Sequence, residues 1–418
     1  MRKYIALTLA FLACSFQLLY AQTDNIHLSF GDGDKNKKSV TVTWTNVHPC
    51  KSEVVYGIDS TELKSKMEPT SKLIAGQQNS FVYKAELKNL QPDKVYFYSI
   101  VVKDQCESAH NVYRFTTPPK NGAKGRYTIG VWGDTQNNEG NKNFEITSKI
   151  VNHLTKYPLN FTVHTGDIVE NGSVASSWNK FLQTAQPLNA NTPFMPSTGN
   201  HDVINAVQDI NFQKPFPIFY DLFSLPEDEL NYSFDYGNIH FIAINSGYCA
   251  GAAKVDKVLF KKDSPEYKWL EEDLEKTKKD KKIKWVILYD HYPVHAHGVS
   301  LVPQWQNQIS PIIDKYKIDL VLSGHRHVYE RHAAIAKGNI EKPTDAHVYR
   351  KPSGTVFITN GSAGGSLQGV GGGGMPSMMF TSGEKMYTYA IMTVHHNQLA
   401  YDVYNIDGQK IDYFKIIK

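Results

Sequence analysis

Short stretches of alternating apolar and polar residues run from Ile26 to about Pro118. This two-residue period is typical of β-strands with one buried face, and turn-forming residues separate the stretches. No helical period interrupts them. The pattern predicts a β-sandwich of roughly 95 residues, as an N-terminal domain over 22–118. Its expected strands are 39–44, 52–56, 81–87, 95–102 and 111–115.

After a segment rich in Pro and Gly at 117–122, apolar strands alternate with amphipathic helices. This alternation predicts an α/β domain over 124–418. Helices are expected at about 144–154 and from Ser264, an N-cap before Pro265, to about Lys278. A hairpin over 386–404 and a strand at 411–417 add antiparallel strands, so we expect mixed sheets flanked by helices. The clearest strands are 127–132, 161–164, 239–244, 285–288, 320–322 and 356–359.

The N-terminus has the pattern of an export signal. Arg2 and Lys3 precede an apolar run that ends at Tyr20, and Ala21 offers a small residue for cleavage. We therefore predict a signal peptide at 1–21 and a secreted or periplasmic protein. An uncleaved anchor is the alternative, but the run is short and contains Gln17. No transmembrane segment is expected once the signal is removed.

Cysteine and charge add two further expectations. Export permits a disulfide, and Cys50 with Cys106 is the expected pair, with two unpaired thiols as the alternative. The 45 basic and 41 acidic residues give a formal charge of +4, which is too small to indicate nucleic-acid binding. The oligomeric state stays unknown from the sequence.

Five polar clusters each follow an apolar strand. In open α/β folds, ligands bind beyond the carboxyl ends of strands, so this placement gathers the clusters into one crevice. Their Asp, Asn and His side chains suit a pair of metal ions. Such a pair stabilises an in-line phosphoryl displacement and activates a bridging water, so we predict a two-metal hydrolytic site. The clusters are Gly133–Gln136, Gly166–Asp167, Gly199–Asp202, Asp290–His291 and Gly324–His327.

The order of these clusters resembles the five-block signature of the metallophosphoesterase superfamily. The N-terminal domain resembles fibronectin type III domains, and with the C-terminal strand at 387–395 the mature chain looks like a purple acid phosphatase. The resemblance implies two metal ions, with Fe, Zn and Mn as alternatives. It implies a bridging role for Asp167, and His201 as general acid or substrate contact. The other implied metal ligands are Asp134 and His327 for one ion and Asn200, His291 and His325 for the other.

One position departs from the family. Purple acid phosphatases carry a Tyr three residues after the bridging Asp, where this sequence has Glu170. We predict Gln136 as the substitute ligand, with an amide that only supports the ligands as the alternative. Glu170 as a ligand is the less favoured interpretation, and a carboxylate that is solvated or that only supports the ligands is preferred. His295 and His297 resemble the histidines of the corresponding family loop, so we expect one of them to contact phosphate.

These inferences predict an exported, acid phosphatase-like phosphomonoesterase. A metal-bridging hydroxide would attack phosphorus while His201 protonates the leaving alkoxide. A phosphodiesterase acting on nucleotides, lipids or glycans is the alternative, since both reactions use the same metals. An alternative from another class is a surface binding module with a vestigial metal site. Retention of the shared ligand positions argues against that reading.

Overall fold

The computed structural model describes residues 23–31, 39–103, 111–138, 142–203, 217–246, 260–297, 302–369, 375–382 and 385–418. The predicted signal peptide and Cys106 lie outside the described residues, so export and the Cys50–Cys106 pairing stay predictions. Within the described ranges, no helix is both long and apolar enough to span a membrane.

The N-terminal part is a sandwich of two four-stranded antiparallel sheets, which confirms the predicted class. Trp44 and Tyr83 stack in its core with ring centroids 5.4 Å apart. The strand pattern missed β1, β4 and β5. One sheet has the order β1 (Asp24–Phe30), β2 (Val40–Asn46), β6 (Phe81–Leu87) and β5 (Thr70–Leu73). The other has β4 (Ser65–Met67), β3 (Ser52–Gly57), β7 (Val95–Val102) and β8 (Tyr113–Thr116).

The rest of the chain forms an α/β unit around two mixed seven-stranded sheets. The first is β11 (Phe194–Ser197), β10 (Phe161–Thr165), β9 (Arg126–Trp132), β22 (Thr388–His395), β23 (Gln398–Asn405), β24 (Lys410–Ile417) and β19 (Val348–Arg350). The second is β12 (Tyr232–Tyr236), β13 (Ile239–Ala243), β14 (Trp285–Tyr289), β15 (Leu320–Ser323), β20 (Val356–Asn360), β16 (Tyr329–His332) and β21 (Met378–Thr381). A small hairpin pairs β17 (Ala334–Ala336) with β18 (Asn339–Glu341). Strands β9, β10 and β11 run parallel, as do β13, β14, β15 and β20.

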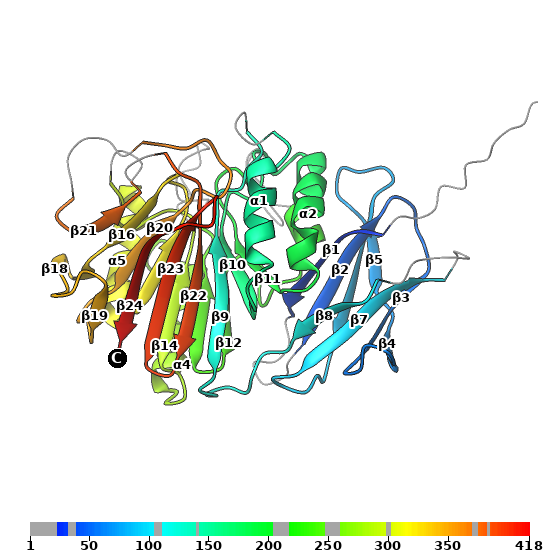
Figure 1. The fold of residues 1–418 in the computed structure, drawn as a ribbon, viewed down its shortest axis with the longest axis horizontal. Helices are drawn as coiled ribbons and strands as arrows, with labels where there is room; N and C mark the ends of the chain where they lie inside the picture. Colours follow the sequence, from blue (N-terminus) through cyan, green and yellow to red (C-terminus); the bar gives the residue numbers. More distant parts are fainter. Residues whose placement is uncertain are drawn as a thin grey trace, which may run out of the picture.

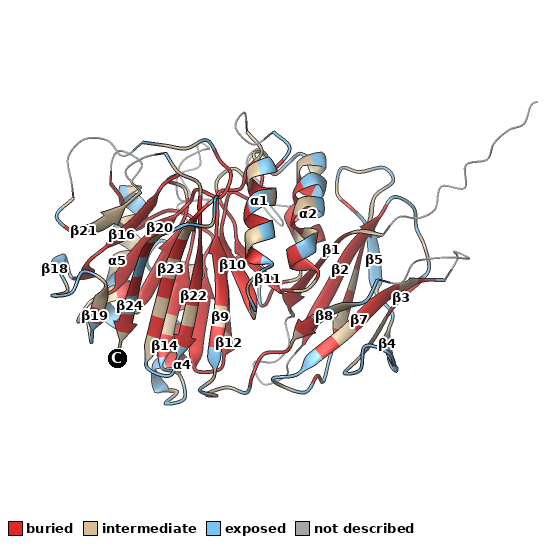
Figure 2. Cartoon of the chain, in the orientation of Figure 1, coloured by how far each residue is buried: buried red, intermediate tan, exposed pale blue. Residues whose placement is uncertain are grey.

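Helices flank both sheets, as predicted, and on the first sheet they lie over the end formed by β10 and β11, whereas β23 and β24 have one face partly open to solvent (Figure 1). Helices α1 (Glu145–Leu154) and α2 (Ala175–Asn189) pack on the first sheet, where Phe181 of α2 stacks near Trp132. Helices α4 (Pro265–Lys279) and α5 (Pro303–Tyr316) pack on the second sheet in a separate apolar cluster. Ser264 caps α4 by accepting from the Tyr267 N–H at 3.2 Å. The central strands are buried, as the red bands of Figure 2 show.

The sandwich is joined to the α/β unit by a buried interface, seen at the right of Figure 1. Strand β1 packs against α2 and β11. The Lys84 ammonium of β6 donates to the carbonyls of Tyr220 and Phe223, at the end of the short helix α3 (Pro217–Leu222). The connecting segment is also anchored, because Gly122 N–H donates to Gly237 O at 2.7 Å. The two units therefore pack as one body, with the domain boundaries at 118 and 124 still a prediction.

Candidate metal centre

The predicted ligands follow the carboxyl ends of parallel strands in both sheets. Asp134, Asp167 and Asn200 follow the neighbouring strands β9, β10 and β11. His291 and His325 follow the neighbouring strands β14 and β15 of the facing sheet, and His327 comes two residues later. The two sheets therefore bring the clusters together at one edge of the α/β unit.

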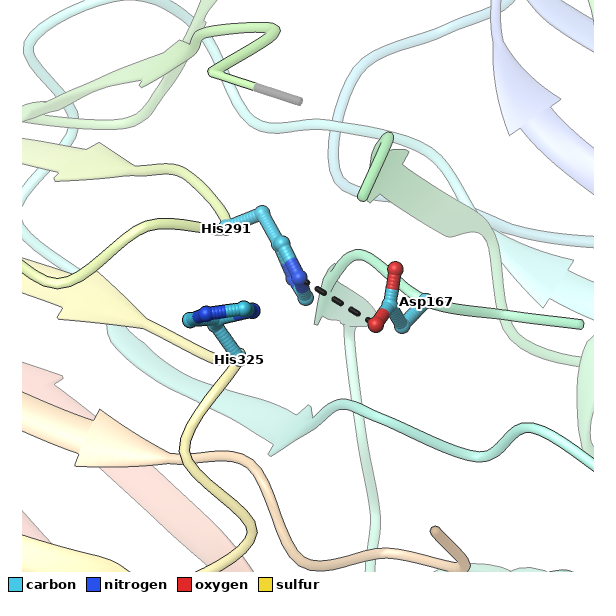
Figure 3. Close-up of side chains that lie close together, drawn as sticks. All are labelled: Asp167, His291 and His325. Atoms are coloured by element: carbon cyan, nitrogen blue, oxygen red, sulfur yellow. Dashed lines mark ion pairs between the residues drawn. The ribbon is translucent and has the colours of Figure 1, made fainter. Parts of the chain in front are cut away.

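The structure contains two groups of side chains that could hold a metal ion, among the residues it describes. Asp167, His291 and His325 form one group, shown in Figure 3, and Asp134, Asp167 and His327 form the other. Within each group the ligand atoms lie within 4.8 Å of one another. Asp167 belongs to both groups, which is the place expected of a bridging carboxylate.

Two amides lie beside these groups. Asn200 Oδ1 is 3.0 Å from His291 Nε2 and 3.1 Å from His325 Nδ1. The Gln136 amide donates to Asp167 Oδ2 at 3.2 Å, and Gln136 is buried. Both side chains thus contact predicted ligands. Their own role as ligands stays a prediction.

Main-chain contacts orient the ligand side chains. His291 Nδ1 donates to Thr165 O at 2.9 Å, and His327 Nδ1 donates to Ser366 O at 2.6 Å. In each ring the other nitrogen, Nε2, then faces a carboxylate, at 3.3 Å from Asp167 Oδ2 and 3.5 Å from Asp134 Oδ1 respectively. Hydrogen bonds of this kind select the tautomer that leaves the second nitrogen for a metal ion.

Asp202 supports the same turn. Its carboxylate accepts from the main-chain N–H groups of Ile168, Val169 and Gly199 at 2.8 to 3.1 Å. It therefore ties the loop after β10 to the loop after β11. Burial, followed by the charge of Asp167, raises the pKa of Asp202 to about 7.

The buried carboxylates in the centre favour a positive charge beside them. Burial lowers the pKa of His291, but the charges of Asp167 and Asp134 outweigh it and raise that pKa to about 10. Burial raises the pKa of Asp134, while His291 opposes this effect. The pKa of His325 falls to about 3, first because of burial and then because of the charge on His291. Two buried carboxylates thus recruit a proton onto His291, and divalent ions would meet the same demand.

Close packing and an open acceptor also mark this edge. Asp134, Asp167 and His325 have positive φ angles of 56°, 52° and 65°, a conformation that also occurs at turns elsewhere in the chain. Buried Asp134 Oδ2 has no hydrogen-bond partner, and a Cβ on Gly361 would come within 2.7 Å of it. An acceptor oxygen left open in a tight polar cluster fits a metal ion.

His201 lies at the rim of the centre. Its N–H donates to Asp167 Oδ1 at 2.8 Å, and its Nε2 is 4.0 Å from Asp167 Oδ2. The side chain is 28% exposed. Glu170 lies next to His201 and belongs to neither metal group among the described residues. The preferred interpretation of Glu170 as a solvated or supporting carboxylate did not name His201 as its contact.

His295 and His297 are placed differently from each other. His295 packs edge-on against Phe357, 4.6 Å between ring centroids, and burial followed by the charge of His332 lowers its pKa to about 4. The His297 N–H donates to Glu330 Oε2 at 2.9 Å. Neither residue belongs to the metal groups found among the described residues. The predicted contact of one of them with phosphate stays a prediction.

Comparison with known proteins agrees with this geometry. Residues 127–329 match the calcineurin-like phosphoesterase family, and residues 23–117 match the N-terminal domain of purple acid phosphatases. The fold is similar to that of purple acid phosphatase PPD1 from yellow lupin seeds, with a TM-score of 0.79 and 20% identity. That match covers 95% of this chain and 74% of the lupin chain. The chain therefore belongs to the metallophosphoesterase superfamily.

Individual relatives show which branch of the superfamily this chain resembles. The chain is 27% identical over 365 residues to probable purple acid phosphatase 20 of Arabidopsis thaliana, covering 83% of this chain and 75% of the relative. It is also 27% identical over 376 residues to acid phosphatase type 7 of Mus musculus, covering 82% of this chain and 78% of the relative. Within the superfamily the protein is thus purple acid phosphatase-like, a metal-dependent phosphoric ester hydrolase. This confirms the resemblance on which the sequence analysis relied.

Proposed function

We propose that this hydrolase is an exported phosphomonoesterase that works with two metal ions and His201. The observation that carries the proposal is the sharing of Asp167 between two ligand groups. One ion would be held by Asp134, Gln136, Asp167 and His327, and the other by Asp167, Asn200, His291 and His325. Bound ions of this kind supply an acidified water and positive charge for the phosphoryl oxygens.

The chain's own contribution to bond breaking is the placement of His201. Its main chain is tied to Asp167, and its ring Nε2 lies 4.0 Å from Asp167 Oδ2 while the side chain is 28% exposed. Nε2 can therefore deliver a proton to the leaving oxygen of an ester bound over the two groups. General acids positioned in this way contribute about 10²–10⁴-fold.

A monoester preference is supported by the names of relatives. A phosphoenolpyruvate phosphatase of Allium cepa is 27% identical over 370 residues, covering 82% of this chain. A phosphodiesterase is the second candidate, because a nucleotide pyrophosphatase/phosphodiesterase of Hordeum vulgare is 26% identical over 282 residues.

Turnover of para-nitrophenyl phosphate against bis-para-nitrophenyl phosphate separates the two candidates. The proposal predicts a higher kcat/KM for the monoester, and this activity should disappear with chelation and return with added metal. A higher kcat/KM for the diester would favour the second candidate, and chelator-resistant turnover would refute the metal requirement.

Export is tested on the expressed full chain. Cell fractionation should place the protein outside the cytoplasm, and its first residue should be Gln22. An intact N-terminus in the cytoplasmic fraction would contradict the predicted signal peptide.

A further inference from the structure

Glu170 stands where purple acid phosphatases carry a metal-binding Tyr, and in this chain it contacts His201. Glu170 Oε1 lies 3.3 Å from His201 Nδ1. The main-chain oxygen of the same residue lies 2.9 Å from that nitrogen. One residue therefore offers two acceptor oxygens to one side of the imidazole ring.

These contacts determine which nitrogen of the His201 ring carries a hydrogen and which way the ring points. A carbonyl oxygen only accepts, so the hydrogen of the 2.9 Å contact belongs to Nδ1. The opposite nitrogen, Nε2, is then directed toward the metal groups, 4.0 Å from Asp167 Oδ2. The Glu170 carboxylate lies beside the same nitrogen at 3.3 Å, and acceptor oxygens on the far nitrogen of a histidine commonly fix both its tautomer and its orientation.

Glu170 is itself held in place. Its N–H donates to Asn137 Oδ1 at 3.3 Å, in the loop after β9. Its side chain is 40% exposed, and that of His201 is 28% exposed. The pair thus lies at the rim, where a leaving group would depart, whereas buried Asp134 and Asp167 line the centre.

We propose that Glu170 is a positioning residue that holds His201 Nε2 toward the leaving oxygen of the substrate. The inference rests on the proposed function, because it requires His201 to act as general acid. In the step concerned, His201 carries hydrogen on both ring nitrogens. The bond from phosphorus to the leaving oxygen breaks, that oxygen takes the proton from Nε2, and the ring keeps hydrogen on Nδ1 alone. Phosphorus gains the oxygen of a water molecule, of whose two protons one stays on the product phosphate and the other returns to Nε2.

The dependence on the leaving group tests this role. Phenyl phosphate needs a proton on its leaving oxygen, whereas 2,4-dinitrophenyl phosphate expels a stable anion without one. Glu170→Ala keeps the main-chain acceptor but removes the carboxylate, so the ring is held by one contact instead of two. It should lower kcat for phenyl phosphate by about 10- to 100-fold, because a misplaced acid loses much of its contribution. It should change kcat for the dinitrophenyl ester little and leave KM and metal content unchanged.

Two further variants sharpen the comparison. Glu170→Gln keeps an accepting oxygen at the same chain length, so it should recover most of the lost turnover. Glu62→Ala removes an exposed carboxylate of the sandwich that pairs with Lys64 at 3.0 Å, and should behave like wild type. Circular dichroism and thermal midpoints establish that each variant is folded.

The possible outcomes distinguish a failure of the Glu170 positioning role from a failure of the proposed function. Loss of metal from Glu170→Ala would make Glu170 a ligand and overturn the positioning role. Equal losses on both esters, or wild-type kinetics on both, would overturn it as well. A wild-type protein that hydrolyses neither ester would instead refute the proposed function.

Discussion

His240 is expected to stabilise the fold in a strongly pH-dependent way. It lies fully buried on β13, with Nδ1 2.7 Å from Asp235 Oδ1 and Nε2 2.7 Å from Asp273 Oδ2. Carboxylates only accept, so both ring nitrogens carry hydrogen and the imidazole is charged. Asp273 belongs to α4, and Ser233 of β12 also donates to it at 3.0 Å. The charged ring therefore links the edge of the second sheet to the helix that covers it.

The magnitude follows from the pKa of His240. Burial lowers it, but Asp273 and Asp235 outweigh burial and raise it from 6.5 to about 9. A rise of this size corresponds to about 3 kcal/mol of stability for the charged form. Because the folded pKa is the higher one, this contribution is fully present below about pH 6.5 and is lost as the pH rises through about 9.

Urea unfolding of wild type and His240→Gln, followed by tryptophan fluorescence, measures this contribution. The variant should unfold at clearly lower urea at pH 6, and the gap between the two midpoints should narrow toward pH 9.5. The matched control His395→Gln, at the exposed last residue of β22, should follow wild type at every pH. A gap that is constant across the pH range would refute the charged-ring argument.

Three further predictions concern the interface and the centre. Lys84→Met removes the ammonium that bonds the end of α3, so thermal unfolding should show a loss of about 2 kcal/mol with metal content kept; an unchanged midpoint would contradict this. Gly365→Ala places a Cβ 2.6 Å from His327 Cε1, so metal titration should show weaker binding, and wild-type affinity would show that the neighbours adjust. The iron-loaded protein should lack an intense visible absorption band, because Glu170 replaces the tyrosinate ligand of the family. The Tyr329 hydroxyl does not replace that ligand, because it donates to Asp412 at 2.8 Å. A visible band that Tyr292→Phe abolishes would contradict this prediction.

The sequence predicted the strands of the centre well because they are fully buried apolar runs. It also predicted which side chains would meet, because ligands at the ends of parallel neighbours must converge. Helices α2 and α5 were not identified, and both contain an internal proline, Pro187 and Pro311, which normally argues against a helix. Strand β1 was missed although polar and apolar residues alternate from Asn25 to Phe30; its polar residues are buried as well, because the strand packs on α2.

The contacts at the site that the sequence did not predict were missed for a different reason. The placements of Glu170 against His201 and of His295 against Phe357 depend on side-chain directions in loops, and no periodic pattern encodes these. The resemblance to purple acid phosphatases could not supply Glu170 either, because the family has a different residue there. Such contacts required the three-dimensional structure.

The central claim is that Asp167 joins two metal sites that hydrolyse phosphate esters. Metal content and para-nitrophenyl phosphate turnover, measured on the same samples of wild type and Asp167→Asn, test it most directly. The account predicts two ions per wild-type chain, and in the folded variant a loss of bound metal with turnover reduced by about 10² or more. Two retained ions with wild-type turnover in Asp167→Asn would contradict it.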